Sequence, residues 1–322
     1  MLQQRPLRQS IHKWHHSRPL HKLTRPPRIH FFDIKSRVGP FSPNTLRTRL
    51  SLNYKRLTYT ESSISYPDIE PLCKSLDIPP AHHDKSATTP RYTLPALLIE
   101  IDDKDNASPL AVARLMQDHH GHCSATSVRH PNLDFGPAVA VSTTLAIAQT
   151  LDAKFPGPEY PALFPFADSE EQARHTQRTI TRAVAPARRL VIPSVPDILD
   201  ERGREYFDTT RRTWFKVDAL NELRPKSEAE EKQLWRGLQA DLDGVIGVLR
   251  REQGGVEAPF LNGHVPTYAD FVVMAFLAWF HRVDRRAWDR VLEFGNGELK
   301  TLWAGCKRWL DGRGEQLEWE VE

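Results

Sequence analysis

The chain has 322 residues, of which 39% are hydrophobic and 26% charged, and its formal net charge is +3. This length allows two domains of ordinary size, and the composition supports a packed core beneath a soluble surface. No stretch approaches the roughly 18 consecutive apolar residues of a membrane-spanning helix, so we expect no membrane partner. Three widely spaced cysteines do not make a disulfide framework, which favours a reducing, cytoplasmic compartment.

Residues 1–28 form a basic extension. Seven Lys and Arg side chains lie in the first 32 residues and no acid precedes Asp33, so the rest of the chain carries a net charge of about −4. The excess positive charge therefore belongs to the extension, and we expect no nucleic acid to bind the fold. We expect the extension to be disordered. The alternatives are a mitochondrial targeting helix or an arm that binds anionic partners.

The first elements after the extension alternate between strand and helix. The pattern predicts a strand, a helix, a second strand and a short helix at residues 29–34, 42–54, 57–65 and 68–76. Ser42 and Pro43 suit a helix start, because serine is a good N-cap and proline fits the first turn.

A second group of elements follows a polar loop. We expect a strand at residues 92–101, entered through Pro95, then a strand at 138–141 and a helix at 142–155. Residues 102–136 have no clean period, so we expect a mobile loop that is either a flexible insertion or retained non-coding sequence. This loop contains the run Asp118–Cys123, but adjacent residues in a loop rarely converge on one ion, so we expect no metal.

The remainder of the chain predicts helices only. Two runs have the capping-box pattern of a helix start, with an acid three residues after a hydroxyl residue: Ser227–Glu230 and Thr267–Asp270. The most apolar run of the chain, Phe271–Phe280, follows the second box and predicts a buried helix. A β/α half followed by an all-α half predicts two domains, residues 29–156 and residues 165–322.

Three stretches together resemble a known family. They are Ser42-Pro43-Asn44-Thr45, then Tyr92–Ala96 with Val141–Ala148, and Thr267–Phe271. In this order they resemble the glutathione transferases, and most closely the fungal and bacterial proteins related to the ligninolytic β-etherases. The resemblance covers most of residues 29–310. It implies a thioredoxin-like α/β domain followed by an all-helical C-terminal domain, an active cleft between them, and a homodimer.

The resemblance also implies roles for six residues. Ser42 would hold the glutathione sulfur as a thiolate at a helix N-terminus, with Asn44 assisting or replacing it, although Ser42 also suits an ordinary N-cap. Leu94 would offer its backbone to the cysteinyl part of glutathione, next to Pro95 in cis; a plain strand-entry proline is the alternative.

The last pair of the six departs from the family pattern. Thr143 and Thr144 lie where the family grips the γ-glutamyl end of glutathione at a helix N-terminus. Thr144 keeps the hydroxyl of that pattern. Thr143 replaces the acid that pairs with the glutathione amine, which weakens the expected grip.

The function implied is the transfer of glutathione, as co-substrate, to a small electrophilic molecule, which we expect to be aromatic. Reductive ether cleavage is a subclass of that reaction. The alternative is a non-catalytic transferase-like protein used for binding or assembly, because a fold does not by itself imply a function.

Overall fold

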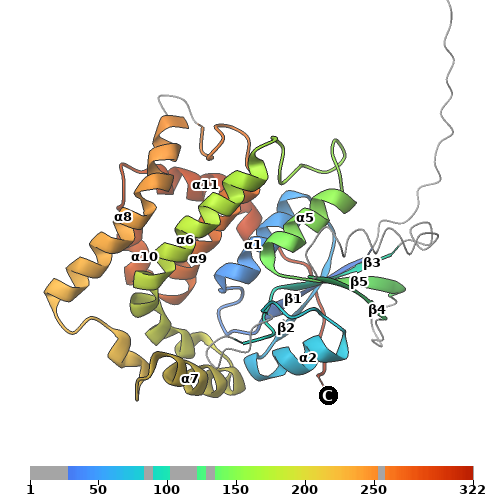
Figure 1. The fold of residues 1–322 in the computed structure, drawn as a ribbon, viewed down its shortest axis with the longest axis horizontal. Helices are drawn as coiled ribbons and strands as arrows, with labels where there is room; N and C mark the ends of the chain where they lie inside the picture. The colour runs from blue at the N-terminus through green and yellow to red at the C-terminus, as the bar shows by residue number, and fades with distance from the viewer. Residues whose placement is uncertain (1–27, 83–89, 102–121, 128–134, 253–257, 322) are drawn as a thin grey trace, which may run out of the picture.

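The structure is a computed structural model that describes residues 28–82, 90–101, 122–127, 135–252 and 258–321. The basic extension, apart from Arg28, and most of the expected insertion therefore lie outside the described residues. The described chain divides between a sheet with flanking helices and a group of helices packed beside it, as Figure 1 shows. This arrangement confirms the predicted fold class.

A mixed sheet of six strands forms the centre of the first part, in the order β4-β5-β3-β1-β2-β6. The strands are β1 (Ile29–Ile34), β2 (Thr60–Ile64), β3 (Ala96–Glu100), β4 (Cys123–Ser127), β5 (Pro137–Ser142) and β6 (Glu315–Gln316). β1 and β2 are parallel, whereas β3 is antiparallel to both β1 and β5. Every residue of β1 is buried, as expected for a central strand covered on both faces.

Helices cover both faces of this sheet. α1 (Pro43–Tyr54) and α5 (Thr144–Lys154) lie on one face, and α2 (Ile69–Ser75), which follows the short 3₁₀ helix η1 (Tyr66–Asp68), lies on the other (Figure 1). Most of α1 is buried because it lies between the sheet and the helical part of the molecule, where it packs on the helices α9 and α11.

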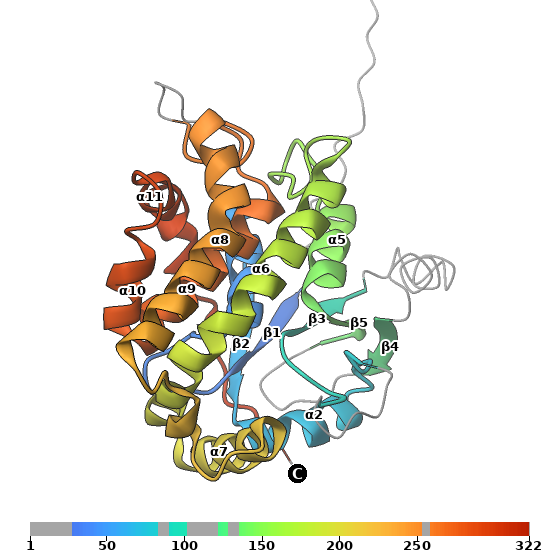
Figure 2. The same ribbon diagram turned by 60° about the vertical axis from the view of Figure 1, so that its left-hand side comes forward.

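The second part is helical and is built around α9. Its elements are α6 (Ser169–Val191), η2 (Ile192–Ile198), α7 (Glu201–Phe215), η3 (Leu220–Leu223), α8 (Glu228–Glu252), α9 (Tyr268–Val283), α10 (Arg285–Val291) and α11 (Glu298–Leu310). Figure 2 shows α6, α8, α10 and α11 around α9. Residues 268–280 of α9 are all buried, because the run is apolar on every side and has neighbours on every side.

The predicted capping box at the start of α9 is present. The Asp270 carboxylate accepts hydrogen bonds from the Thr267 backbone N–H at 2.8 Å and the Thr267 hydroxyl at 3.0 Å. Its second oxygen accepts a bond from the Leu261 N–H at 2.7 Å. This one side chain therefore fixes both the start of the central helix and the loop before it.

Two buried ionic groups hold α1 in place. Arg49 donates to Asp33 at 2.8 Å and to Glu61 at 2.6 Å, which ties the helix to β1 and β2. Lys55 at the end of α1 donates to Asp152 of α5 at 2.6 Å and to the Pro161 carbonyl at 2.9 Å. Because Pro161 belongs to the link between the two parts, the Lys55 contacts also fix that link.

Two segments correct the sequence-based assignment. Part of the expected loop at residues 102–136 is the strand β4, which pairs antiparallel with β5 along its length and buries Cys123 and Thr126. The expected all-helical domain ends at Leu310, because the following residues return to the sheet, where β6 pairs with β2. Both segments add a strand to an edge of the sheet, and strand pairing is long-range, so neither was evident from local pattern.

Candidate functional site

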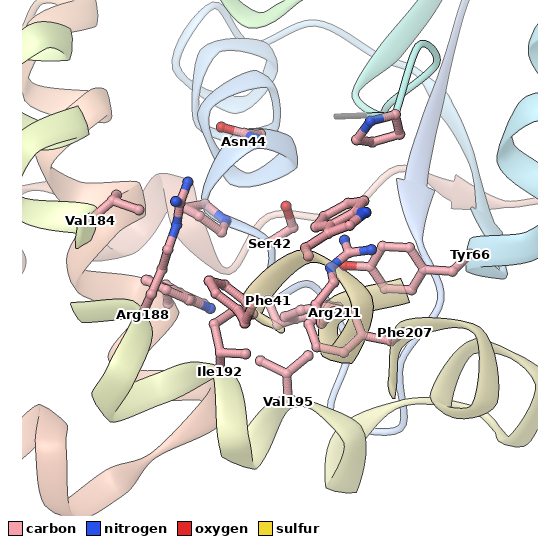
Figure 3. A pocket seen from close by; sticks show the side chains of 15 residues that line it. Phe41, Ser42, Asn44, Tyr66, Val184, Arg188, Ile192, Val195, Phe207 and Arg211 are labelled. Carbon is pink, nitrogen blue, oxygen red and sulfur yellow. The ribbon is translucent and has the colours of Figure 1, made fainter. Parts of the chain in front are cut away.

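A cavity of about 510 Å³ lies where the N-terminus of α1 meets α6, η2 and α7. Six aromatic side chains contribute to its wall: Phe41, Tyr66, Phe207, Trp214, Phe215 and Trp279. Figure 3 shows the wall from close by, with Ser42 near the centre of the view. Most of the lining residues are apolar or aromatic and a few are polar, which is a common form of small-molecule site at a domain junction.

Ser42 and Asn44 both line this cavity, as the sequence predicts for a site at this helix start. Ser42 occupies the N-cap position of α1, but its side chain makes no capping hydrogen bond, although its carbonyl accepts the Leu46 N–H at 2.9 Å. Ser42 as a residue is 7% exposed, and it lines both this cavity and the smaller one beside it. It therefore faces the cavity at the positive end of a helix of 12 residues.

A smaller cavity of about 130 Å³ adjoins the first, shares Ser42, Asn44, Tyr66, Pro90 and Arg211 with it, and has one acid, Glu70, in its own wall. Leu94 lines this smaller cavity, and the peptide bond between Leu94 and Pro95 is cis, as predicted. The structure thus brings three of the six predicted residues to one continuous hollow, with Pro95 directly behind Leu94.

Thr143 and Thr144 begin α5 and are not among the residues that line either cavity. Thr143 and Pro95 each adjoin the last pair of the β3–β5 ladder, Ala96 with Ser142, so the start of α5 lies at the same end of these strands as Pro95. Thr143 has a φ of 66°, in the left-handed region that a β-branched residue rarely adopts. Its surroundings must hold it there at some cost in free energy.

Arg211 is a prominent wall residue that the sequence analysis did not single out. The carbon of its guanidinium lies 3.9 Å from the ring centre of Trp214, 4.4 Å from that of Phe207 and 5.3 Å from that of Tyr66. Residues 207, 211 and 214 share one face of α7, and that spacing is the signal the sequence offered. Burial lowers the pKa of Arg211 and raises that of Tyr66 to about 12, so at neutral pH Tyr66 is an uncharged phenol.

All three cysteines of the chain are buried, and none lines either cavity. Burial raises the pKa of Cys73 to about 12 and that of Cys123 to about 11, and it also raises the pKa of Cys306. A nucleophilic thiolate is therefore not available from the protein at neutral pH and would have to enter with a ligand.

The described part of the chain offers neither a metal site nor a membrane-spanning helix. Within the described ranges, no group of three or more His, Cys, Asp or Glu side chains is placed to hold a metal ion. Of the run Asp118–Cys123, only His122 and Cys123 fall inside those ranges. No helix in the described part of the chain has the length and apolar character needed to cross a membrane.

Known proteins resemble this chain over nearly its whole length. It is 36% identical to the glutathione S-transferase-like protein ustS of Aspergillus flavus over 302 residues, which cover 91% of this chain and 95% of that protein. A family model described as Glutathione S-transferase, C-terminal domain matches residues 172–309.

Solved structures share the fold. Two glutathione S-transferases of Ceriporiopsis subvermispora, both crystallised in complex with glutathione, are similar with TM-scores of 0.67 and 0.65. They are 22% and 25% identical, and each alignment covers 87% of this chain and 97% or 98% of the other. A glutathione transferase of Phanerochaete chrysosporium gives a TM-score of 0.67 at 24% identity, covering 88% of this chain and 97% of that one.

Proposed function

The chain belongs to the glutathione S-transferase-like family, and from this premise we propose that it transfers glutathione to a small aromatic electrophile. The observation that carries the proposal is the Ser42 hydroxyl, which stands at a helix N-terminus, is not used as a cap, and lines a cavity with aromatic walls. An inert N-cap serine would be expected to bond the backbone of its own helix.

The proposed chemistry begins with the glutathione thiol. Ser42 donates a hydrogen bond to the sulfur, and the positive end of α1 further favours the thiolate over the thiol. Asn44, on the same turn, supplies a second donor or takes the place of the first. The released proton leaves to solvent, and the thiolate is then the nucleophile.

The proposed binding site for the peptide part of glutathione adjoins this point. The Leu94 backbone, held by the cis bond to Pro95, pairs with the cysteinyl residue in the smaller cavity. The γ-glutamyl carboxylate meets the N-terminus of α5 at Thr143 and Thr144, where N–H groups point outward. Thr143 offers no charge to the γ-glutamyl amine, so we expect modest affinity for glutathione.

The electrophile occupies the larger cavity, with its ring among the aromatic side chains of the wall. A carbon–sulfur bond forms as the thiolate attacks, and the bond to the leaving group breaks, with the electron pair going to the leaving group. Displacement of an aryl halide yields a halide ion, and displacement at an ether yields an alkoxide or aryloxide that takes a proton from water. Both reactions need the same placement of the sulfur.

Two measurements test the proposal. Calorimetric titration with glutathione tests binding, and the full chain is then assayed with 1-chloro-2,4-dinitrobenzene and with a model aryl ether. Glutathione binding with turnover of either substrate supports the transferase. Glutathione binding without turnover of any aryl halide or ether supports the second candidate, a non-catalytic binding protein, which the uncharged Thr143 favours. Absence of glutathione binding contradicts both assignments of the site.

A further inference from the structure

Two arginines face the larger cavity, and neither has a carboxylate within ion-pair distance in the described part of the chain. Arg188 lies in the last turn of α6 and Arg211 lies in α7. None of the fifteen lining residues is an acid. Figure 3 shows the two side chains on either side of Ser42 in that view.

Other arginines on the same two helices do have such partners. On α6, Arg174 pairs with Glu170 and Arg189 with Glu230, and on α7, Arg204 pairs with Asp197 and Arg212 with Asp208. Several arginines of these helices that lie outside the cavity therefore have carboxylate partners, although the exposed Arg178 of α6 has none among the described residues. Arg188 and Arg211 differ from Arg178 because both line a cavity whose wall contains no acid.

The surroundings of Arg211 make this lack costly. Three aromatic rings enclose its guanidinium, which donates a hydrogen bond to the neighbouring Thr210 hydroxyl at 2.9 Å. A cation removed from water without a counter-charge is unfavourable, and the positive charge of Arg188 adds repulsion. An anion in the cavity would offset both the missing counter-charge and the repulsion between the two arginines. It would also accept hydrogen bonds from the N–H groups of the planar guanidinium.

We propose that the cavity selects aromatic electrophiles that carry an anionic oxygen group, such as a carboxylate or sulfonate. Arg211 holds this group with the help of Arg188, while the aromatic ring packs against Phe41, Phe207 and Trp279. The assignment rests on the proposed function for the identity of the ligand as an electrophile. The preference for an anion rests on the cavity alone and is measured separately.

A matched pair of fluorescent probes tests the preference in the full chain without glutathione. 8-Anilinonaphthalene-1-sulfonate and N-phenyl-1-naphthylamine share an aromatic frame, but only the first is charged. Each is titrated against the protein, and we expect the sulfonate to bind at least about tenfold more tightly, since charge-assisted hydrogen bonds are strong. Equal affinity, or tighter binding of the neutral amine, overturns the proposal.

Three variants test which side chains cause the preference for the sulfonate probe. Arg211→Met keeps the length and the contact with the rings, and it should bring the ratio of the two affinities close to one. Arg188→Gln changes an exposed side chain, so the fold should persist, and we expect a loss of about two- to fivefold in sulfonate affinity. Arg204→Gln makes the same charge change on α7 outside the cavity and should leave both affinities unaltered.

The variants also separate this proposal from other roles of the arginines. An equal loss of sulfonate affinity in Arg204→Gln would assign the preference to overall charge and overturn the proposal. So would Arg188 and Arg211 variants that lose affinity for glutathione while keeping their discrimination between the probes, because the arginines would then serve the tripeptide.

The turnover of a charged and an uncharged substrate gives a second test of the same preference. 4-Chloro-3-nitrobenzoate and 4-chloro-3-nitrobenzamide both lose chloride as the glutathione sulfur bonds to the ring, and each enzymatic rate is divided by its uncatalysed rate. We expect the benzoate to be favoured about tenfold or more in kcat/KM, and an equal or reversed preference counts against the proposal. If neither reacts, the transferase assignment fails for these substrates and the probe titrations alone decide on the anion.

Discussion

At the scale of the residue, Ser42 occupies the N-cap position of α1 without making the hydrogen bond of a cap. Its side chain makes no cap hydrogen bond, so removing the hydroxyl should cost the fold less than the roughly 1 kcal/mol of a working N-cap. A change in chemistry on removing it would then reflect the ligand rather than a weakened helix.

Ser42→Ala should raise the pKa of the bound glutathione thiol by about one to two units, because a hydrogen bond to a charged group is worth about 1.5–3 kcal/mol. The rate at neutral pH should fall about 10- to 100-fold, with a smaller change in glutathione affinity. Thiolate absorbance measured against pH in the presence of bound glutathione checks the shift.

Asn44→Ala is the matched variant, because Asn44 lines the same cavities from the first turn of α1. If Asn44 carries the sulfur contact, its loss will have the larger effect on the thiolate titration. An unchanged titration in both variants would remove this helix start from the mechanism.

Variants of Thr143 test the glutathione site by a gain in affinity rather than by a loss of activity. Thr143→Glu restores an acid beside the N-terminus of α5 and should tighten glutathione binding about two- to fivefold, since a partly exposed ion pair is worth roughly 0.5–1 kcal/mol. Thr143→Gln has the same shape without the charge and should not tighten it. Titration calorimetry at low salt compares the two, and equal affinities would place the glutathione amine elsewhere.

At the scale of the element, α9 depends on Asp270. Burial raises the pKa of Asp270 from its ordinary 3.8 to about 6, although hydrogen bonds from Leu261, from Thr267 and from its own backbone N–H act in the opposite direction. The folded state therefore binds the proton more tightly than the unfolded state. The stabilisation from this proton is complete below about pH 4 and is lost as the pH rises through 6.

Asp270→Asn should be less stable than the natural chain at pH 4, because the amide turns a donor toward Thr267. The difference in free energy of unfolding between the two proteins should narrow by about 2–3 kcal/mol between pH 4 and pH 7. Only the natural chain loses the stability that is linked to the Asp270 proton. Urea unfolding of both proteins at the two pH values measures this difference. A difference that is independent of pH would mean that Asp270 is ionised throughout.

The same elements show what can be predicted from the sequence. The start of α9 was predicted because a capping box is local, with both partners within four residues. The start of α1 was predicted from the Ser-Pro pair at residues 42 and 43, and the cis bond before Pro95 was predicted from the family resemblance. In each case the deciding residues are neighbours in the chain.

Elements that depend on distant partners were not predicted. β4 consists of small and polar residues, Cys-Ser-Ala-Thr-Ser, and is a strand because β5 offers it an edge. The wall of the cavity was missed for a similar reason. Arg188 and Arg211 are unremarkable in a helical pattern and become distinctive only when α6 and α7 face the start of α1.

At the scale of the whole molecule, the C-terminal segment returns to the first domain. Trp319 packs against His30 and Phe32 of β1, with ring centres 5.0 Å and 4.9 Å apart, and the Ser62 hydroxyl of β2 donates to the Leu317 carbonyl at 2.6 Å. The polypeptide therefore passes between the sheet and the helical part twice, first through the link after α5 and again through this segment.

Trp319→Ala should lower the free energy of unfolding by about 1–3 kcal/mol, because a half-buried aromatic loses its contacts with two rings of the core strand. Glu320→Ala, one residue later and exposed, should change it by less than about 0.5 kcal/mol. Thermal unfolding of both variants gives the comparison. Equal stabilities would show that the segment rests on the sheet without supporting it.

The place of β6 in the chain has a consequence for biosynthesis. β2 lies near residue 60 and its edge partner near residue 315, so the ribosome makes the first strand long before the second. The nascent first domain has an open strand edge until β6 has been made, and such edges invite pairing with other chains. A premature stop codon after α11 would leave that edge open permanently. Such a stop codon should therefore yield aggregates in the cell, although the cavity residues would all have been translated.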